Sequence, residues 1–391
     1  MKKIKVILLA LLTIALLFSM FACKKQQDSA AEKQPVQDEA NVDADSPPEL
    51  EQVEDDGEAV SDQSVAAEDD QEEPQDNTSE EGEDTEANPD PQEVEKINFA
   101  LDWTPNTNHS GLFLAQQQGF YAAEGLEVDF QESDMNFIEM VATESATFGI
   151  ASQEQVLQAR ASAAKIPVVS VAAILQHNTS GFASPVDREI KAPSDFAGKT
   201  YSGWGTELEL AFIKTLMEKE GADYSQVKII NQSANNFIAS METEADFAWI
   251  YWGWDGVNCE LQDYATNFIL LQDIDPRLDF YSPTIITNET VIKDNPDLIK
   301  RFLRATAKGY ELAIENPELA VEALLEVAPE LDEELVRRSQ TWLNDKYIDD
   351  ADSWGLMKPE MWSDFKAWML DNKTLENDLD PAEAFTNDFL P

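Results

Sequence analysis

The segment Lys96-Ile-Asn-Phe-Ala-Leu-Asp-Trp-Thr-Pro-Asn-Thr-Asn-His-Ser-Gly-Leu-Phe-Leu-Ala-Gln-Gln-Gln-Gly119 contains a strand, a polar loop and a helix in immediate succession. Apolar and polar residues alternate up to Asp102, as in a half-buried strand. Pro105 and the asparagines after it are typical of a turn. Residues 111–119 are mostly helix formers and end at Gly119, a common helix C-terminus. The segment therefore predicts one strand-loop-helix unit of an α/β fold.

The same rhythm continues on the C-terminal side. We expect strands at residues 126–131, 147–150 and 167–175, and helices at 136–144 and 154–164. It restarts with strands at 199–202, 227–230, 245–252, 268–271 and 284–287, and helices at 207–221 and 236–242. Helices at 296–316, 317–327, 332–343 and 359–370 form a tail. Such alternation indicates mostly parallel sheets. We predict a bilobal α/β fold with two crossover segments. Residues 95–178 and 280–391 form the first lobe and the helical tail, and 179–279 form the second lobe.

The N-terminus predicts export. Met1-Lys-Lys-Ile-Lys is a positive segment, an apolar run covers residues 6–18, and Ser19-Met-Phe-Ala-Cys23 places a small residue before a cysteine. This order is typical of a lipoprotein signal peptide, here residues 1–22, with lipid attached to Cys23. A plain signal peptide or a short membrane anchor is the alternative. We expect an extracytoplasmic protein held to the cell membrane through its lipid. Cys259 is the only other cysteine, so no internal disulfide is expected.

Residues 23–94 differ in composition from the rest of the chain. No aromatic residue occurs between Phe21 and Phe99, and no Lys or Arg between Lys33 and Lys96. Such a segment buries too little apolar surface to fold, so we expect an acidic, disordered tether. The whole chain has 27 basic and 77 acidic residues, a net charge of −50. That charge repels phosphate backbones and excludes nucleic-acid binding.

Aromatic, amide and acidic residues gather in four loops that follow predicted strands or mark the crossover. The candidate ligand-binding residues are Trp103, Asn106, Asn108, His109, Gln153, Glu154, Asn178, Trp204, Glu209, Tyr251, Trp254 and Asp255. Rings flanked by amides and carboxylates suit a flat, polar heterocycle. Glu209 or Asp255 would pair with the amino group and ring nitrogen of an aminopyrimidine. The alternative is that the tryptophans belong to the core and the asparagines cap turns.

Other site chemistries have little support. The two histidines stand in separate loops beside aromatic residues, a poor pattern for a metal site, so none is expected. The sequence contains no Gly-rich phosphate loop, no nucleophile elbow and no paired-cysteine motif. We expect no cofactor and no covalent chemistry.

Several of these loops carry a resemblance. Asp102-Trp-Thr-Pro-Asn-Thr-Asn-His109, Gln176-His-Asn-Thr-Ser-Gly181, Gly203-Trp-Gly205 and Tyr251-Trp-Gly-Trp-Asp-Gly256 resemble the NMT1/THI5-like family. The similarity continues through Lys308-Gly-Tyr-Glu-Leu-Ala-Ile-Glu-Asn-Pro317 to the end of the chain. It implies a type II-like periplasmic-binding-protein fold that closes on hydroxymethylpyrimidine or formylaminopyrimidine and delivers this thiamine precursor to an ABC permease. We expect a monomer.

Two other functions stay open. Riboflavin or another aromatic heterocycle would also stack on the rings. The family further contains pyrimidine-synthesising enzymes, which carry a lysine and a histidine where this chain has Ala151 and Gln155. Those enzymes also carry a cysteine-rich run, whereas Phe280-Tyr-Ser-Pro-Thr284 has no cysteine. The resemblance therefore favours a binding protein over an enzyme.

Overall fold

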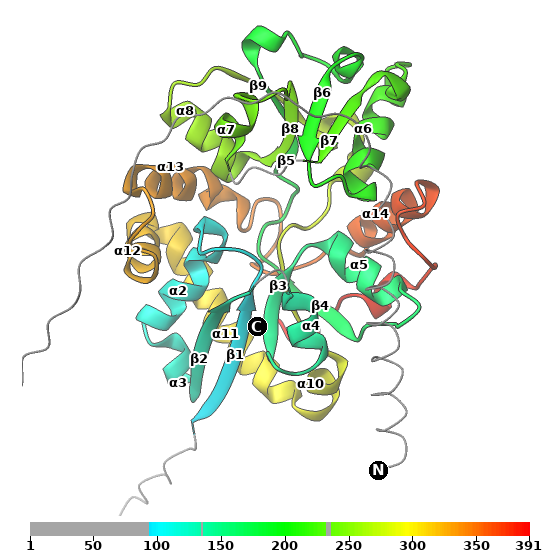
Figure 1. Cartoon of the computed structure of the whole chain (residues 1–391). Coiled ribbons are helices and arrows are strands. Elements are labelled where there is room, and N and C mark those ends of the chain that lie inside the picture. Colours follow the sequence, from blue (N-terminus) through cyan, green and yellow to red (C-terminus); the bar gives the residue numbers. More distant parts are fainter. Residues whose placement is uncertain (1–93, 134–135, 232–235) are drawn as a thin grey trace, which may run out of the picture. The chain divides into compact units, whose positions relative to one another are not determined.

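The computed structural model describes residues 94–133, 136–231 and 236–391. Two five-stranded sheets organise these residues (Figure 1). The first sheet has the order β2-β1-β3-β10-β4. Its strands are β1 (Glu95–Leu101), β2 (Leu126–Glu132), β3 (Phe148–Ala151), β4 (Val168–Ala173) and β10 (Thr284–Asn288). β1 pairs in parallel with β2 and β3, whereas β10 pairs antiparallel with β3 and β4. β10 is therefore the one strand of this sheet that is antiparallel to the other four.

The second sheet repeats this plan in the order β7-β6-β8-β5-β9. Its strands are β5 (Ser180–Pro185), β6 (Thr200–Gly203), β7 (Lys228–Asn231), β8 (Phe247–Tyr251) and β9 (Thr266–Leu270). β6 pairs in parallel with β7 and β8, and β5 pairs antiparallel with β8 and β9. β1 and β6 thus hold equivalent positions, each between two parallel partners.

β5 is the strand that the sequence pattern missed. Ser-Gly-Phe-Ala-Ser-Pro has one large apolar residue and no alternation, so its local signal is that of a loop. In the fold every residue of β5 is buried, and both of its edges are paired. A Cβ atom on Gly181 would lie 2.3 Å from the backbone oxygen of Ile269, so glycine allows this close pairing.

Helices cover both sheets. The helices among the strands of the first sheet are α2 (Ser110–Gln117), α3 (Phe120–Ala123), α4 (Phe137–Ala142) and α5 (Gln153–Ala161). Those among the strands of the second are α6 (Glu207–Lys219), α7 (Phe237–Met241), α8 (Val257–Leu261) and α9 (Leu271–Ile274). The tail contains α10 (Glu289–Asp294), α11 (Pro296–Glu315), α12 (Pro317–Val327), α13 (Glu333–Leu343) and α14 (Pro359–Asp371). None of the helices in the described residues is both long and apolar enough to cross a membrane.

Short 3-10 turns and one π-helical turn complete the described residues. The 3-10 turns are η1 (Thr107–His109), η2 (Val186–Arg188), η3 (Pro193–Phe196), η4 (Tyr224–Gln226), η6 (Pro276–Leu278), η7 (Asn344–Lys346) and η8 (Pro381–Glu383). The π-helical turn is η5 (Trp252–Gly256), where the sequence pattern extended a strand to residue 252. Because η5 directly follows β8, it turns the aromatic residues after Tyr251 away from the strand direction.

α2 and α11 pack side by side against the first sheet (Figure 1). Their closest approach is between two glycines. A Cβ atom on Gly309 would lie 2.1 Å from the backbone oxygen of Gly111, and one on Gly111 would overlap the ring of Tyr310. The Tyr310 hydroxyl donates to the backbone oxygen of Asn108 at 2.7 Å. The tail therefore supports the loop that follows β1.

The tail also contacts the elements of the second sheet. Phe212 of α6 stacks on Trp368 of α14 at a ring distance of 5.0 Å, and the Trp368 indole donates to the Thr215 hydroxyl at 3.1 Å. On α13, the Ser339 hydroxyl donates to the backbone oxygen of Gly253 at 2.5 Å. α6 and η5 of the second lobe are thus each held by a different tail helix.

The N-terminal predictions lie outside the described residues. They comprise the signal peptide, Cys23 and almost all of the tether. The lobe boundaries at 178/179 and 279/280 stay a prediction, although β5 to β9 all fall between them and the strands of the other sheet fall outside.

Candidate functional site

Two exposed tryptophans follow equivalent strands of the two sheets. Trp103 comes two residues after β1 and is 42% exposed, and Trp204 follows β6 directly and is 60% exposed. Every other tryptophan in the described residues is less exposed. Leaving a large aromatic ring in water forgoes apolar burial that is worth a few kcal/mol. Rings left exposed at the ends of parallel strands are therefore candidates to stack on a ligand.

The loop after Trp103 is held by its own hydrogen bonds. The Asn106 side chain accepts from the Asn108 backbone N–H at 2.9 Å and donates to the Thr104 backbone oxygen at 3.0 Å. The Asn106 backbone N–H donates to Nδ1 of His109 at 3.3 Å. Asn106 and His109 are both buried, so they shape the loop and do not present free groups. Asn108 is half-buried, and the amide group of its side chain makes no hydrogen bond to the described residues.

His109 instead positions Asp102, an acid that was not among the predicted site residues. Because Nδ1 accepts a hydrogen bond, the ring proton is on Nε2, which lies 3.0 Å from Oδ1 of Asp102. The His109 ring is fully buried, while the Asp102 side chain is 27% exposed. Asp102 ends the quoted strand and precedes Trp103. Its position at a strand end was the signal that could have identified it.

Two side chains at the start of α5 differ in their hydrogen bonds. The amide of Gln153 has partners in the fold, whereas one carboxyl oxygen of Glu154 has none among the described residues. Gln153 is fully buried, accepts from the Tyr281 backbone N–H at 2.9 Å and donates to the Met361 backbone oxygen at 3.2 Å. The side-chain amide of Gln153 therefore connects segments of the fold. Glu154 is also buried, yet its Oε2 has no hydrogen-bond partner among the described residues. Burial raises the pKa of Glu154, and the Ser152 side chain and the backbone N–H groups at the helix start offset only part of that effect.

Tyr251 connects Glu154 to the second sheet. Burial raises the pKa of Tyr251, and the charge of Glu154 raises it further, with smaller contributions from Asp102 and Glu209. Three acids from both sheets therefore lie within electrostatic range of one phenol. The Ser282 hydroxyl donates to the Tyr251 oxygen at 3.2 Å. Two residues earlier in β8, Nε1 of Trp249 is buried and has no partner among the described residues.

Glu209 has its carboxylate fully engaged. Its Oε2 accepts from the Tyr201 hydroxyl at 2.9 Å and from the Gly205 backbone N–H at 3.1 Å, and its Oε1 accepts from the Thr206 hydroxyl at 3.1 Å. The side chain is buried. The pairing of Glu209 with a ligand stays a prediction, and these hydrogen bonds do not favour it. Glu209 fixes the loop that carries Trp204.

The side-chain amide of Asn178 likewise has hydrogen-bond partners within the fold. It is fully buried at the first crossover, donates to the Leu278 backbone oxygen at 2.8 Å and accepts from the Ser180 backbone N–H at 2.9 Å. Its own backbone N–H donates to Asp279 at 2.9 Å. Asn178 therefore ties the two crossover segments together, because Leu278 and Asp279 belong to the second one.

The η5 residues point in different directions. Trp254 packs against the apolar core of the first sheet and is partly buried. Asp255 accepts from the backbone N–H of Phe237 at the start of α7, and burial raises its pKa to about 6. Trp254 thus contributes to packing between the lobes, and Asp255 faces α7 and not the Glu154–Tyr251 pair.

The structure therefore divides the predicted residues into two groups. We define the interlobe site as Asp102, Trp103, Glu154, Trp204 and Tyr251, which come from the ends of β1, β6 and β8 and the start of α5. The other predicted residues support loops, crossovers or packing, except Asn108, whose side-chain amide has no hydrogen-bond partner among the described residues. Within the described residues, no three His, Cys, Asp or Glu side chains are grouped closely enough to hold a metal ion.

Two mostly parallel α/β sheets of equivalent strand order, joined by two crossovers, define the class of bilobal periplasmic-binding-protein folds. Solved structures of this class match the chain. The aliphatic sulphonate binding protein SsuA of Escherichia coli superposes with a TM-score of 0.58 at 13% identity, covering 74% of this chain and 91% of its own. The alkanesulfonate-binding protein SsuA of Xanthomonas axonopodis pv. citri gives 0.57 at 14%, covering 74% and 98%. The desulfurization enzyme DszB gives 0.55 at 12%, covering 75% and 97%.

The chain belongs to the NMT1/THI5 like family, whose model matches residues 106–320. One relative is the formylaminopyrimidine-binding protein of Halalkalibacterium halodurans, 26% identical over 76% of this chain and 92% of its own length. Another is the riboflavin-binding protein RibY of Chloroflexus aurantiacus, at 25% over 76% and 87%. The 4-amino-5-hydroxymethyl-2-methylpyrimidine phosphate synthase of Legionella pneumophila is 25% identical over 76% and 92%. Both binding proteins and enzymes therefore resemble this chain.

Proposed function

We propose that this chain is the solute-binding component of an ABC importer and that it captures an aminopyrimidine of the thiamine-precursor type. The observation that carries the proposal is the unpartnered Oε2 of buried Glu154, which lies near Tyr251 between strand ends that also carry Trp103 and Trp204. A buried acid without a partner is costly, and a ligand that pairs with it recovers that cost.

The chemistry of Glu154 suits an aminopyrimidine. The edge of this ring presents an amino N–H donor beside a ring-nitrogen acceptor. A protonated carboxyl group presents an O–H donor beside a C=O acceptor, so the two edges match through two parallel hydrogen bonds. The raised pKa of Glu154 favours this protonated form. Trp103 and Trp204 would then stack on the faces of the ring.

The main competing ligand, riboflavin, fits this acidic site less well. The imide edge of its flavin ring presents two carbonyl oxygens on either side of an N–H. A protonated Glu154 could pair with one such carbonyl oxygen and the N–H, so it does not exclude the flavin ring. The Asp102 carboxylate, whose charge also acts on Tyr251, offers only acceptor lone pairs and would repel the carbonyl oxygens. Trp249 Nε1, buried in β8 without a partner among the described residues, is a donor that could serve one carbonyl oxygen.

A pyrimidine-synthesising activity has less support than binding. Where the enzymes of the family carry a lysine, this chain has Ala151, a fully buried residue of β3. Where they carry a histidine, Gln155 accepts from the Ser152 backbone N–H at 3.0 Å and caps α5. We therefore propose a binding protein and not an enzyme. A lipid anchor on Cys23, an extracytoplasmic location, a monomeric state and a permease partner complete the proposal.

Calorimetric titration tests this function. The chain is purified through denaturation and refolding to remove any endogenous ligand, and it is then titrated separately with hydroxymethylpyrimidine, formylaminopyrimidine, thiamine and riboflavin. We expect a dissociation constant of about 1 µM or lower, or roughly −8 kcal/mol, for one of the two pyrimidines. Tight binding of riboflavin alone would replace the proposed ligand, and heat release from none of the four would refute it.

A further inference from the structure

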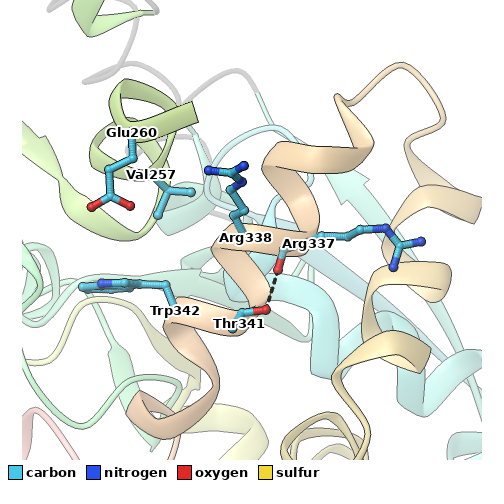
Figure 2. Close-up of a pocket in the computed structure, with 6 residues that line it drawn as sticks. All are labelled: Val257, Glu260, Arg337, Arg338, Thr341 and Trp342. Atoms are coloured by element: carbon cyan, nitrogen blue, oxygen red, sulfur yellow. Dashed lines mark hydrogen bonds between the residues drawn. The ribbon is translucent and has the colours of Figure 1, made fainter. Parts of the chain in front are cut away.

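The contact between α13 and the second lobe contains two cavities. The smaller one, about 330 Å³, lies between α8 and α13 and is lined by Val257, Glu260, Arg337, Arg338, Thr341 and Trp342 (Figure 2). Figure 2 shows Arg338 directed toward α8 and Arg337 directed away from it. Both arginines are already paired with glutamates of the tail. The smaller cavity therefore presents little unsatisfied chemistry.

The larger cavity, about 500 Å³, has the volume of a small-molecule site. Its lining comes from the first crossover, from β9 and α9, from η5 and from the α13–η7 segment. The lining residues are His177, Asn178, Thr179, Trp252, Phe268, Leu270, Gln272, Asp273, Trp342, Lys346 and Asp349. None of them belongs to the interlobe site, so we call this space the crossover cavity.

Three aromatic rings form its apolar wall. Trp252 and Phe268 lie 4.7 Å apart between ring centroids, and Trp342 approaches from α13. All three are only partly buried, so part of each ring faces the cavity or solvent. Rings from separate elements around one space suit a flat aromatic ligand.

Lys346 supplies a positive charge without an acidic partner. Its Nζ lies 4.1 Å from the centroid of the Trp342 ring, and no described carboxylate lies within 4.0 Å of it. His177 lies between two acids, with Nδ1 2.6 Å from Asp279 and Nε2 3.2 Å from Asp350, so a positive charge on its ring would already be paired. Asp273 and Asp349 are exposed at the rim. Lys346 is therefore the cationic side chain of the cavity lining that makes no ion pair with a described carboxylate.

We propose that the crossover cavity is a second binding site, and that it accepts a flat aromatic molecule with a single anionic group. The ring packs against Trp252, Phe268 and Trp342, and the anion contacts Lys346. Thr179 also lines the cavity, and its hydroxyl group is a further donor for the ligand. This site does not depend on the identity of the ligand at the interlobe site.

A pair of matched probes tests the proposal on the full chain. 2-Naphthoate and 2-naphthalenemethanol have the same ring, and only the first carries a charge. In calorimetric titrations we expect naphthoate to bind with one-to-one stoichiometry and about tenfold more tightly than the alcohol, because of its contact with Lys346. In the Lys346→Gln variant the two probes should bind equally, whereas Lys346→Arg should keep the difference.

Two further titrations locate the probe. Trp252→Leu should weaken both probes, because it removes part of the ring wall, and Trp204→Ala should leave both unchanged. Equal affinity of the two probes for the unmodified chain would overturn the proposal, as would loss of naphthoate binding in Trp204→Ala. These results are independent of the pyrimidine titration, so failure of one proposal is distinguishable from failure of the other.

Discussion

At the residue scale, hydrogen bonding, and neither burial nor residue type, distinguishes the two buried acids of the candidate site. Glu154 and Glu209 are both buried glutamates near Tyr251. Glu209 receives three hydrogen bonds from its own loop, whereas Oε2 of Glu154 receives none from the described residues. Burial raises the pKa of Glu154 and so favours its neutral form. Glu154 is thus the acid available to a ligand.

We predict that pyrimidine affinity depends on pH through Glu154. Its raised pKa means that the proton needed for the ring nitrogen is present at low pH and is lost as pH rises through that pKa. Above it, affinity should fall about tenfold per pH unit, because the competent fraction of the protein falls by that factor. Calorimetric titrations between pH 5 and 9 measure this dependence.

Two variants of Glu154 serve as matched controls. Glu154→Gln presents an N–H donor and a C=O acceptor at every pH, so it should bind within severalfold of the unmodified chain at low pH and lose the pH dependence. Glu154→Leu removes both groups and should bind at least tenfold more weakly. A pH-independent affinity in the unmodified chain would contradict the shared-proton model.

At the element scale, the loop after β1 depends on a close helix contact. α2 begins at the end of that loop, and Gly309 of α11 approaches the Gly111 backbone without room for a Cβ atom. The Tyr310 hydroxyl, next in sequence, holds the loop at Asn108. The tail therefore positions Trp103 through helix packing, although it contributes no residue to the interlobe site.

Gly309→Ala should destabilise the fold. Alanine is favoured over glycine in a helix by about 1 kcal/mol, yet overpacking costs about 1–3 kcal/mol, and here the conflict is with backbone atoms. We expect a net loss of about 2 kcal/mol in the free energy of unfolding, measured with urea. Gly119→Ala is the matched control, since nothing lies within 4 Å of its Cβ position. Its positive φ should cost about 1 kcal/mol. Equal stability of Gly309→Ala and the unmodified chain would exclude the packing argument.

The crossover segments are joined by an ionic contact at His177. Its hydrogen bond to Asp279 raises the pKa of His177, and Asp350 and Asp349 add to the effect. Lys358 pairs with Asp350 on the far side. A raised histidine pKa gives stability that is complete below the ordinary pKa and is lost as pH rises through the folded-state value.

His177→Gln should therefore lower the melting temperature more at pH 6 than at pH 9. The contact is partly exposed, so we expect a loss of about 1 kcal/mol at pH 6 and little above pH 8. Asp350→Asn, which removes only the longer and more exposed partner, should have a smaller effect. Melting curves followed by circular dichroism measure both, and a deficit that grows with pH would have the wrong sign for this contact.

At the scale of the whole molecule, the proposed ligand would join the two lobes. Trp103 and Trp204 follow equivalent strands of different sheets, so neither lobe alone contains both rings. A ligand that contacts both lobes favours the arrangement in which both contacts exist. The tail already contacts the second lobe at two places: α14 packs against α6, and α13 donates a hydrogen bond to η5.

Trp103→Ala and Trp204→Ala should each weaken pyrimidine binding by about tenfold or more, since stacking on one aromatic ring contributes about 1–3 kcal/mol per base. The double variant should lose less than the product of the two, because a ligand that no longer joins the lobes has lost the benefit of closure already. Val186→Ala, another exposed apolar residue of the second lobe, is the control and should bind normally. Unchanged affinity in both tryptophan variants would remove the interlobe site from consideration.

The sequence by itself determined the alternation of strands and helices, the family and the strand-end loops where ligand groups gather. Periodicity and motif are local properties, so they can be read without coordinates. Only the tertiary structure decided which polar side chains in those loops are free. The partners of Gln153 and Asn178 lie about a hundred residues or more away, and His109 is turned toward Asp102. β5 was missed for the same reason, because its burial and pairing come from β8 and β9. Hydrogen-bond satisfaction and burial depend on distant neighbours, which no local pattern contains.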